Sequence, residues 1–561
     1  MAKEDYINWS KEELLKEVKK LRKRKKYGIV WEDKLEQVAE LCKEKLPILT
    51  EDKGKEIETD KEKPVNILIE GDNYHALSVL NYTHKGKIDV IYIDPPYNTG
   101  ARDWKYNNDY IDYEDTFRHS KWLSFMEKRL KLAKNLLKRN GVLICTIDEN
   151  EHATLGLLLQ EVFQDREIVG VVIIHNPAGV QGKNFSYTHE FAYFVYPKNG
   201  LFIGKTTREK ELISPLRDWG GTSARKLAKT CFYPIIIKNE KIVGFGEVCP
   251  EDFHPKSANV LHKDGSIHIY PIDGKGIERK WVYSRQSAEE NVHQLSVKKI
   301  NSEYVIIRKK ELFTYRTVWD DKKYYANVYG SKLLNNIIPT RFPFPKSLYA
   351  VEDCIKAVIH DKNNAIILDF FAGSGTTGHA VMELNNKDGG ERRFILCTNN
   401  EDNNGEGTKI ATDICYPRIK KIVKGYIGLV DKNQYGGLGG NLKYFKTDFV
   451  DAQPTDRNKR RLVDKSTEML CLKEDCFEEY RKGHEFRTFT NGQDKYLSII
   501  YDDEGIEPFK KEVKKLKKKF VVYVFSLDES AREEEFEDVA EMVELKPIPA
   551  VILNVYKRIF K

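Results

Sequence analysis

An apolar run from Val90 to Ile93 is followed at once by Asp94 and two consecutive prolines. Proline has no amide hydrogen to give to a neighbouring strand, so a strand in this run must end at Asp94. The stretch Val65 to Ile69 indicates an earlier strand, and Ala76 to Leu80 a helix between the two. Strand, helix and strand in this order predict a βαβ unit of an α/β fold. Ligands of such folds bind at the carboxyl ends of the strands, where Asp94 falls.

A second strand end with polar chemistry lies far along the chain. The strand from Ala365 to Leu368 is followed by Asp369, and residues 373–378 match the pattern Gly-x-Gly-x-x-Gly directly before a helix. Glycines let the backbone approach a ligand closely, and the start of a helix offers free amide hydrogens. The pattern by itself fits either a dinucleotide or S-adenosylmethionine. In dinucleotide enzymes it usually stands near the start of the chain, so its late position argues against a dinucleotide.

The segment Asp94 to Tyr97 combines a carboxylate, backbone carbonyls and an aromatic ring. These groups suit a flat base with an exocyclic amino group, because Asp94 and the Pro95 carbonyl can accept amino hydrogens while Tyr97 stacks on the ring. A ligand at Gly373 can react with that amino group only if the two strands are neighbours in one sheet. Their adjacency is the central structural prediction. The alternative is an ordinary strand followed by a proline turn.

The sequence Asp-Pro-Pro-Tyr after an apolar strand resembles the catalytic motif of DNA methyltransferases that methylate amino groups. The order of parts, with this motif first, an insert second and the glycine turn last, resembles the β class of that family over residues 63–430. The resemblance implies a Rossmann-like, S-adenosylmethionine-dependent methyltransferase core with circularly permuted motif order, and no metal. It implies catalytic roles for Asp94, Pro95, Pro96 and Tyr97. The contacts to the methyl donor that it implies come from Asp369, Phe371, Gly373, Gly375 and Thr376.

Four further residues are predicted to lie at the donor site. Asp72 and Asn73 follow the strand that begins the catalytic half, although each could equally cap the next helix. Lys346 ends a proline-rich segment that in the family contributes to the donor site, and its alternative role is that of a surface lysine on a proline turn. Glu401 is the acidic residue expected after the next strand to hold the ribose hydroxyls, although two asparagines intervene.

We expect five parts in the chain: an N-terminal helical arm and linker (1–62), the catalytic half of the methyltransferase core (63–200), a target-recognition insert (201–335), the cofactor half (336–435) and a small C-terminal α/β domain (436–561). Ser10 and Glu13 predict a capping box for a helix that runs to residue 26. Residues 98–117 are expected to form a long, functional and mobile loop. The insert is rich in residues that suit contacts to DNA phosphates and bases, or an ordinary solvated surface. They are Arg217, Trp219, Arg225, Lys226, Arg279, Trp281 and Arg285.

An N-terminal helix, a long insert and an extra C-terminal domain further resemble the modification subunit of type III restriction–modification systems. The resemblance implies methylation of adenine N6 at a short site in double-stranded DNA, with the adenine flipped out of the helix. It also implies a homodimer and a separate restriction subunit with ATPase and nuclease activity. Asp rather than Ser before Pro-Pro favours adenine over cytosine N4, the first alternative. A non-catalytic DNA-binding protein on this fold and a nicotinamide-dependent oxidoreductase are the others.

Composition narrows the class of protein only modestly. At 561 residues the chain is too long for one core, and a net charge of +7 matters for DNA binding only where basic residues cluster. No apolar run is long enough to span a membrane, and the first residues contain no apolar signal core. The nine cysteines form no Cys-x-x-Cys pair. We therefore expect a cytoplasmic protein with reduced thiols and no membrane partner.

Overall fold

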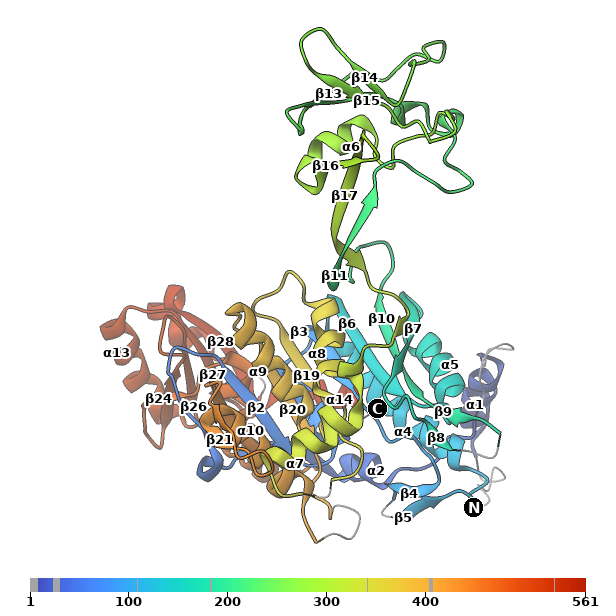
Figure 1. The fold of residues 1–561 in the computed structure, drawn as a ribbon. Helices are drawn as coiled ribbons and strands as arrows, with labels where there is room; N and C mark the ends of the chain where they lie inside the picture. Colours follow the sequence, from blue (N-terminus) through green and yellow to red (C-terminus); the bar gives the residue numbers. More distant parts are fainter. Residues whose placement is uncertain are drawn as a thin grey trace. The chain divides into compact units, whose positions relative to one another are not determined.

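The computed structural model describes residues 9–23, 31–107, 109–181, 184–340, 342–402, 407–528 and 530–560. The chain forms two compact units (Figure 1). The first comprises the residues up to Gly204 and those from Arg316 onward, and the second is Lys205–Tyr315. Within the described ranges, no helix is both long and apolar enough to cross a membrane.

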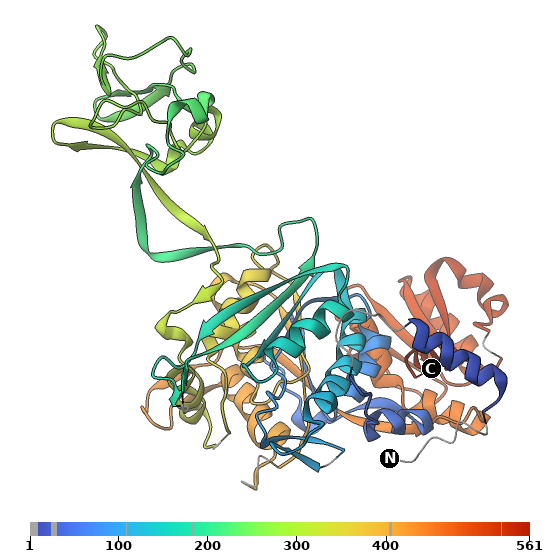
Figure 2. The ribbon, with the colours of Figure 1, turned by 90° about the vertical axis from the view of Figure 1, so that its right-hand side faces the viewer.

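The first unit is built on a sheet with the strand order β1-β23-β2-β20-β19-β3-β6-β10-β7-β18 (Figures 1 and 2). Neighbouring strands from β23 to β6 pair in parallel, while β1 and β10 pair antiparallel at the two sides of this block. The strands are β1 (Lys45–Glu51), β2 (Val65–Glu70), β3 (Ile88–Ile93), β6 (Leu137–Ile147), β7 (Arg166–Ile174), β10 (His189–Pro197), β18 (Val318–Trp319), β19 (Ile366–Asp369), β20 (Arg393–Thr398) and β23 (Asn441–Asp451). The predicted α/β class is confirmed.

Helices cover both faces of this sheet, which explains why its central strands are mostly apolar. All residues of β3 are buried. Ile91 and Ile93 share one core with residues of the first helix layer, and Val90 and Tyr92, which alternate with them, point to the other face. The first layer contains α3 (Asn73–Thr83), α4 (Arg118–Leu136) and α5 (His152–Val162). The second contains α8 (Leu348–Val358), α9 (Thr376–Asp388) and α10 (Tyr416–Lys424).

The two segments singled out from the sequence lie at the ends of neighbouring strands. β3 pairs in parallel with β19, with Ile91 opposite Leu368. Both strands therefore end at the same edge of the sheet, β3 just before Asp94 and β19 at Asp369. The predicted adjacency of these strands is confirmed.

The N-terminal helix is present as α1 (Lys11–Lys23), and its capping box forms as predicted. Ser10 N donates to Glu13 Oε2 at 2.8 Å, and Glu13 N donates to Ser10 Oγ at 3.2 Å. The predicted continuation to residue 26 lies outside the described residues. A further short helix, α2 (Gln37–Glu44), leads into β1.

The prediction of a long loop over residues 98–117 is wrong. This segment contains a hairpin of β4 (Ala101–Tyr106) and β5 (Asp109–Asp112). Trp104 and Tyr106 are buried, with the half-buried Lys105 between them, so the two-residue period of a strand is present. It extends over too few residues, among too many charges, to be recognised in the sequence.

The C-terminal part contains the predicted order of strand, helix and strand, as β26 (Tyr496–Ile500), α13 (Ile506–Leu516) and β27 (Phe520–Phe525). These strands belong to a second sheet with β24 (Glu478–Arg481), β25 (Phe486–Thr490) and β28 (Val543–Ile548). β23, however, lies in the large sheet between β1 and β2, and the last helix, α14 (Ala550–Ile559), packs on α3. The division of the chain into five domains stays a prediction.

The second unit has its own small core. One of its sheets contains β11 (Lys205–Pro215), β16 (Leu295–Ile300) and β17 (Glu303–Thr314). The other contains β12 (Ile235–Lys238), β13 (Lys241–Phe245), β14 (Asn259–Leu261) and β15 (Ile267–Ile269). Tyr233, Ile235, Trp281 and Ile306 pack between them.

Candidate active site

A cavity of about 300 Å³ lies at the carboxyl edge of the parallel strands. Its walls come from the turns after the four adjacent strands β2, β20, β19 and β3, and from the β4–β5 hairpin. Its volume is at the lower end of the range for small-molecule sites. The lining residues are Asp72, Asn73, Asp94, Pro96, Trp104, Lys105, Tyr110, Phe125, Phe370, Phe371, Gly373, Thr398, Asn399, Glu401, Asp402 and Ile410.

The predicted site residues fall into two groups. Those that line the cavity are Asp72, Asn73, Asp94, Pro96, Phe371, Gly373 and Glu401. The others support its walls, and they are Pro95, Tyr97, Lys346, Asp369, Gly375 and Thr376. The structure thus brings both predicted segments to one cavity, although their roles in substrate binding stay predictions.

Asp72 fills both roles considered for it, whereas Asn73 lines the cavity without capping the helix. Asp72 caps α3 by accepting a hydrogen bond from Tyr74 N at 2.7 Å, and it also lines the cavity. Asn73 Nδ2 donates to Phe370 O at 2.9 Å, while its Oδ1 accepts from Arg129 Nε at 2.5 Å. Asn73 therefore ties the turn after β2 to the turn after β19. Arg129 was missed from the sequence, where it stands as a lone charge on the apolar face of α4.

The turn after β19 adopts backbone conformations that favour glycine. Gly373 has a φ of 48° and Gly375 a φ of 80°, both in the left-handed region. A Cβ atom on Gly373 would lie 3.2 Å from the Phe342 ring, and one on Gly375 would lie 3.1 Å from Cys415 Sγ. Glycine at these two positions keeps the turn tight and leaves the cavity open.

Asp369 and Thr376 stand behind this turn. The Asp369 carboxylate accepts hydrogen bonds from Phe371 N at 2.9 Å and from Thr377 Oγ1 at 2.5 Å, and burial raises the pKa of Asp369 to about 7. Thr376 Oγ1 accepts from the Arg418 guanidinium at 2.8 Å. Arg418 is fully buried, and burial lowers its pKa to about 10. Sequence reasoning missed Arg418, because α10 also contains three lysines and its sequence does not distinguish Arg418 from these charges.

Asp94 is held by neighbours from two other elements. Thr146 Oγ1 of β6 donates to Asp94 Oδ1 at 2.6 Å, and Lys346 Nζ lies 3.1 Å from the same oxygen. The Asp94 side chain remains 26% exposed and lines the cavity. Burial raises the pKa of Asp94 above its usual value, and the charge of Lys346 opposes that rise.

The two proline carbonyls differ in their partners. Trp122 Nε1 of α4 donates to Pro96 O at 2.7 Å, so this oxygen is already bonded. No hydrogen bond reaches the Pro95 carbonyl from the part of the chain that the structure describes. The Tyr97 hydroxyl donates to Glu190 Oε2 at 2.9 Å, which fixes the ring beside Asp94.

Lys346 lies with Asp94 rather than at the wall formed by the glycine turn. Its Nζ is 2.8 Å from Glu190 Oε2 and 4.4 Å from the centre of the Tyr97 ring. Burial alone would lower the pKa of Lys346, but Asp94 and Glu190 raise it above its usual value. Lys346 is therefore a partly buried cation shared by two carboxylates. Glu190 was missed because it reads as one polar residue at the start of a strand.

Glu401 lies on the cavity wall, as predicted, although the asparagines precede it. Lys105 Nζ of the β4–β5 hairpin is 3.6 Å from Glu401 Oε2 and 4.7 Å from the centre of the Tyr110 ring. The hairpin therefore closes one side of the cavity by reaching the turn after β20.

The basic and aromatic residues of the second unit have different environments. Trp281 is 2% exposed and packs in the core, so the prediction that it contacts DNA is wrong. Arg225 and Arg279 form ion pairs within the unit. Trp219 is 67% exposed, and the Arg217 guanidinium lies 4.5 Å from the centre of its ring. Of these residues, Trp219 has the exposure that stacking on a base requires.

Truncation of Trp281 and truncation of Trp219 should therefore have different effects on the stability of the second unit. Trp281→Ala is expected to destabilise the second unit by about 3–5 kcal/mol, because it removes a fully buried ring. Trp219→Ala is expected to change stability by less than about 0.5 kcal/mol. Hydrogen exchange of the β12 amides, followed by mass spectrometry, measures this local stability. Slow exchange in both variants would contradict the core role of Trp281.

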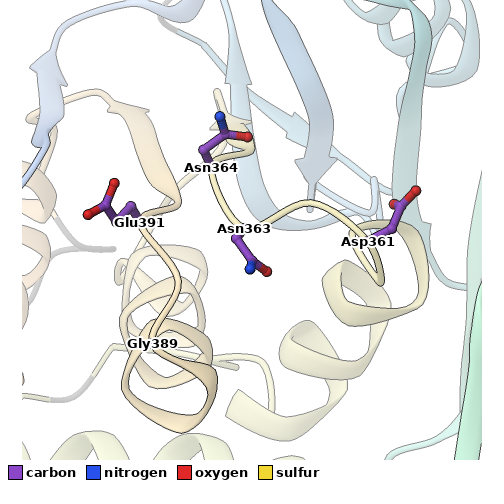
Figure 3. Close-up of a pocket in the computed structure, with 5 residues that line it drawn as sticks. All are labelled: Asp361, Asn363, Asn364, Gly389 and Glu391. Atoms are coloured by element: carbon purple, nitrogen blue, oxygen red, sulfur yellow. The ribbon is translucent and has the colours of Figure 1, made fainter.

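A second hollow, of about 390 Å³, lies at the opposite ends of the strands (Figure 3). Asn363 and Asn364 precede β19, and Glu391 precedes β20, so this hollow is at the amino edge of the sheet. Asp361 and Gly389 complete its lining. None of these five residues belongs to the segments described above, and the hollow is not part of the candidate site.

The fold and the cavity together define the class of protein. A parallel α/β sheet that brings an Asp-Pro-Pro-Tyr strand end and a later glycine turn to one cavity is the arrangement of a permuted methyltransferase core. The chain belongs to the DNA methylase family whose members modify amino nitrogens N6 and N4, and the model of that family matches residues 88–435.

Curated relatives share the same region. The chain is 32% identical over 426 residues to the EcoPI Mod subunit of a type III restriction–modification enzyme from Escherichia phage P1, covering 67% of this chain and 64% of that subunit. It is 31% identical over 358 residues to the type II methyltransferase M.KpnI from Klebsiella pneumoniae, covering 59% of this chain and 79% of that enzyme. The chain thus matches less than two thirds of the length of the phage subunit.

Solved structures resemble the chain more distantly. TTHA0409 from Thermus thermophilus, solved with S-adenosyl-L-methionine, is 14% identical with a TM-score of 0.28, over 59% of this chain and 87% of that one. M1.HpyAVI, also solved with S-adenosylmethionine, is 16% identical with a TM-score of 0.28, over 63% and 98%.

Proposed function

We propose that this protein transfers a methyl group from S-adenosylmethionine to adenine N6 in a short DNA sequence. The observation that supports this most is the pairing of β3 with β19, which brings Asp94 and Gly373 to the same cavity. A donor and an acceptor held at these two places would meet without a long movement of the chain.

The cavity has the chemistry that S-adenosylmethionine requires. Phe371 and Ile410 offer apolar surface to a flat ring, and Glu401 offers a carboxylate to ribose hydroxyls. Asp72 and Asp94 place negative charge where a cationic ligand gains from it. When bound, S-adenosylmethionine supplies a methyl group activated by a positively charged sulfur. The turn at Gly373, where an added Cβ would crowd the Phe342 ring, lines the cavity and would hold part of this donor.

The acceptor side would make adenine N6 more reactive. The lone pair of this nitrogen is delocalised into the ring, which makes it a poor nucleophile. Asp94 and the Pro95 carbonyl would accept the two N6 hydrogens and favour a tetrahedral nitrogen. The Pro95 oxygen suits this role better than the Pro96 oxygen, which Trp122 already occupies. The Tyr97 ring would stack on the flipped base and offset part of the cost of unstacking it.

We further propose that the chain is the modification subunit of a type III system. The likeness to the EcoPI Mod subunit, and to the EcoP15I Mod subunit of Escherichia coli at 27% identity over 421 residues, supports this. The subunit would act as a homodimer on double-stranded DNA and associate with a restriction subunit that carries ATPase and nuclease activity. Its native mass in solution and co-purification with a co-expressed restriction subunit test these two points.

The chemical proposal is tested with purified protein, labelled S-adenosylmethionine and unmethylated DNA. We expect label in the DNA and N6-methyladenine among its nucleosides by mass spectrometry. If the nucleosides contain N4-methylcytosine and no N6-methyladenine, the acceptor is cytosine N4 rather than adenine N6. If the protein binds DNA and the donor but transfers no methyl group, it is a non-catalytic DNA-binding protein.

The rate of transfer should fall at low pH. Asp94 must be ionised to accept the amino hydrogens, and burial raises its pKa, so the rate is lost as the pH drops through that value. Because the charge of Lys346 lowers the pKa of Asp94, Lys346→Gln is expected to move this loss to higher pH. Single-turnover rates measured across the pH range check the shift. A shift to lower pH would contradict the assignment.

A further inference from the structure

Glu190 of β10 is a buried carboxylate that the proposed reaction does not use. Its side chain is 4% exposed, and its Oε2 accepts hydrogen bonds from Tyr97 OH at 2.9 Å and from Lys346 Nζ at 2.8 Å. The same Lys346 Nζ lies 3.1 Å from Asp94 Oδ1. Glu190 therefore contacts both Tyr97 and the cation that faces Asp94.

The cluster of Asp94, Glu190 and Lys346 contains two carboxylates but only one ammonium. One ammonium, on Lys346, serves two carboxylates, and it lies closer to Glu190 than to Asp94. Burial would raise the pKa of Glu190, but Lys346 and the nearby His175 lower it below its usual value, so Glu190 stays ionised. Burying a second carboxylate is expensive, and one Lys–Asp pair would suffice for packing. A second acid that shares the lysine with Asp94 therefore points to a role beyond stability.

We propose that Glu190 is a positioning residue of the acceptor site. The proposal rests on the proposed methyl transfer. Glu190 fixes the Tyr97 ring through its hydroxyl and shares Lys346 with Asp94, so that Lys346 keeps Asp94 charged without being paired with it alone. Without Glu190, Lys346 would pair with Asp94 alone and compete for the oxygens that receive the amino hydrogens.

The test is a double-mutant cycle of Glu190→Gln and Lys346→Gln, measured in single turnovers at saturating donor and DNA. Glu190→Gln is expected to slow transfer about 10- to 100-fold, the range for a misplaced reacting group. The affinity for S-adenosylmethionine should stay within about twofold, because a loss in turnover alone indicates an interaction made on the way to the transition state. Because Glu190 and Lys346 hold the same Tyr97 hydroxyl and Lys346 also pairs with Asp94, the two losses should overlap, and the double variant should be slowed by much less than the product of the single losses.

Two variants serve as controls. Glu352 of α8 is also a buried glutamate, paired with Lys387 at 2.6 Å but outside the cavity, so Glu352→Gln should keep the wild-type rate. Glu190→Asp keeps the charge and should recover part of the rate. If Glu190→Gln does not bind the donor, Glu190→Asp decides instead. Slowed transfer with unchanged donor affinity supports the role, and a wild-type rate overturns it.

The outcomes separate this inference from the proposed function. Wild-type protein that transfers no methyl group would defeat the proposed function itself. Wild-type protein that transfers, together with a Glu190→Gln variant that is equally fast, would defeat only the role of Glu190. Losses that multiply in the double variant would show that Glu190 does not act through Lys346 and would also overturn the inference.

Discussion

Replacing Asp94 by alanine is expected to lower the rate of methyl transfer by about 10³-fold, within the range for a group that handles a proton of the reacting atom. The carboxylate is 26% exposed, lines the cavity and is held by Thr146 and Lys346. The variant removes the acceptor of the amino hydrogens but leaves the glycine turn and the Glu401 wall intact. Donor affinity should therefore change little. Single-turnover rates and equilibrium binding of S-adenosylmethionine measure the two effects separately.

The same strand provides the control for Asp94. Asp89 lies at the other end of β3, where it is buried and paired with Lys138 at 2.7 Å. Asp89→Asn removes a charge from the same strand without touching the cavity, so it should leave transfer unchanged. Full turnover by Asp94→Ala would show that the acceptor pocket has been assigned to the wrong residues.

The features that could be predicted from the sequence depend on local patterns. The prolines after Ile93 mark a strand end whatever the tertiary structure, and the glycines at 373 and 375 mark a tight turn. Two strand ends that must share one reaction then imply that the strands are neighbours, and β3 does pair with β19. The family resemblance supplied the identity of the ligand, which the patterns alone left open.

The features that could not be predicted depend on which distant residues meet. Lys346 and Glu190 are 156 residues apart and form an ion pair of 2.8 Å beside Asp94. Nothing in the sequence near either residue predicts that it contacts the other. Residue type alone also gave a wrong prediction in the second unit. Tryptophan is a residue that often stacks on bases, but Trp281 packs in a hydrophobic core. Periodicity failed for β4 because the strand is short and charged.

Gly373→Asp is expected to weaken binding of S-adenosylmethionine by at least about 100-fold, which corresponds to about 2.8 kcal/mol. Gly373 lines the cavity, and its added side chain would begin with a Cβ atom only 3.2 Å from the Phe342 ring. The rest of the side chain would have to occupy the space for the donor or displace Phe342. Equilibrium binding of the donor in the absence of DNA measures the loss, and transfer should fall with it.

Backbone strain must be separated from this filling of the cavity. Gly389, at the end of α9, has a φ of 71° and no heavy atom within 4 Å of an added Cβ. Gly389→Asp therefore places the same residue in a left-handed conformation at an open position, where aspartate is tolerated. We expect this variant to bind the donor normally. If both variants bind equally well, the turn at Gly373 does not hold the donor; if both bind equally poorly, strain rather than occupied space explains the loss.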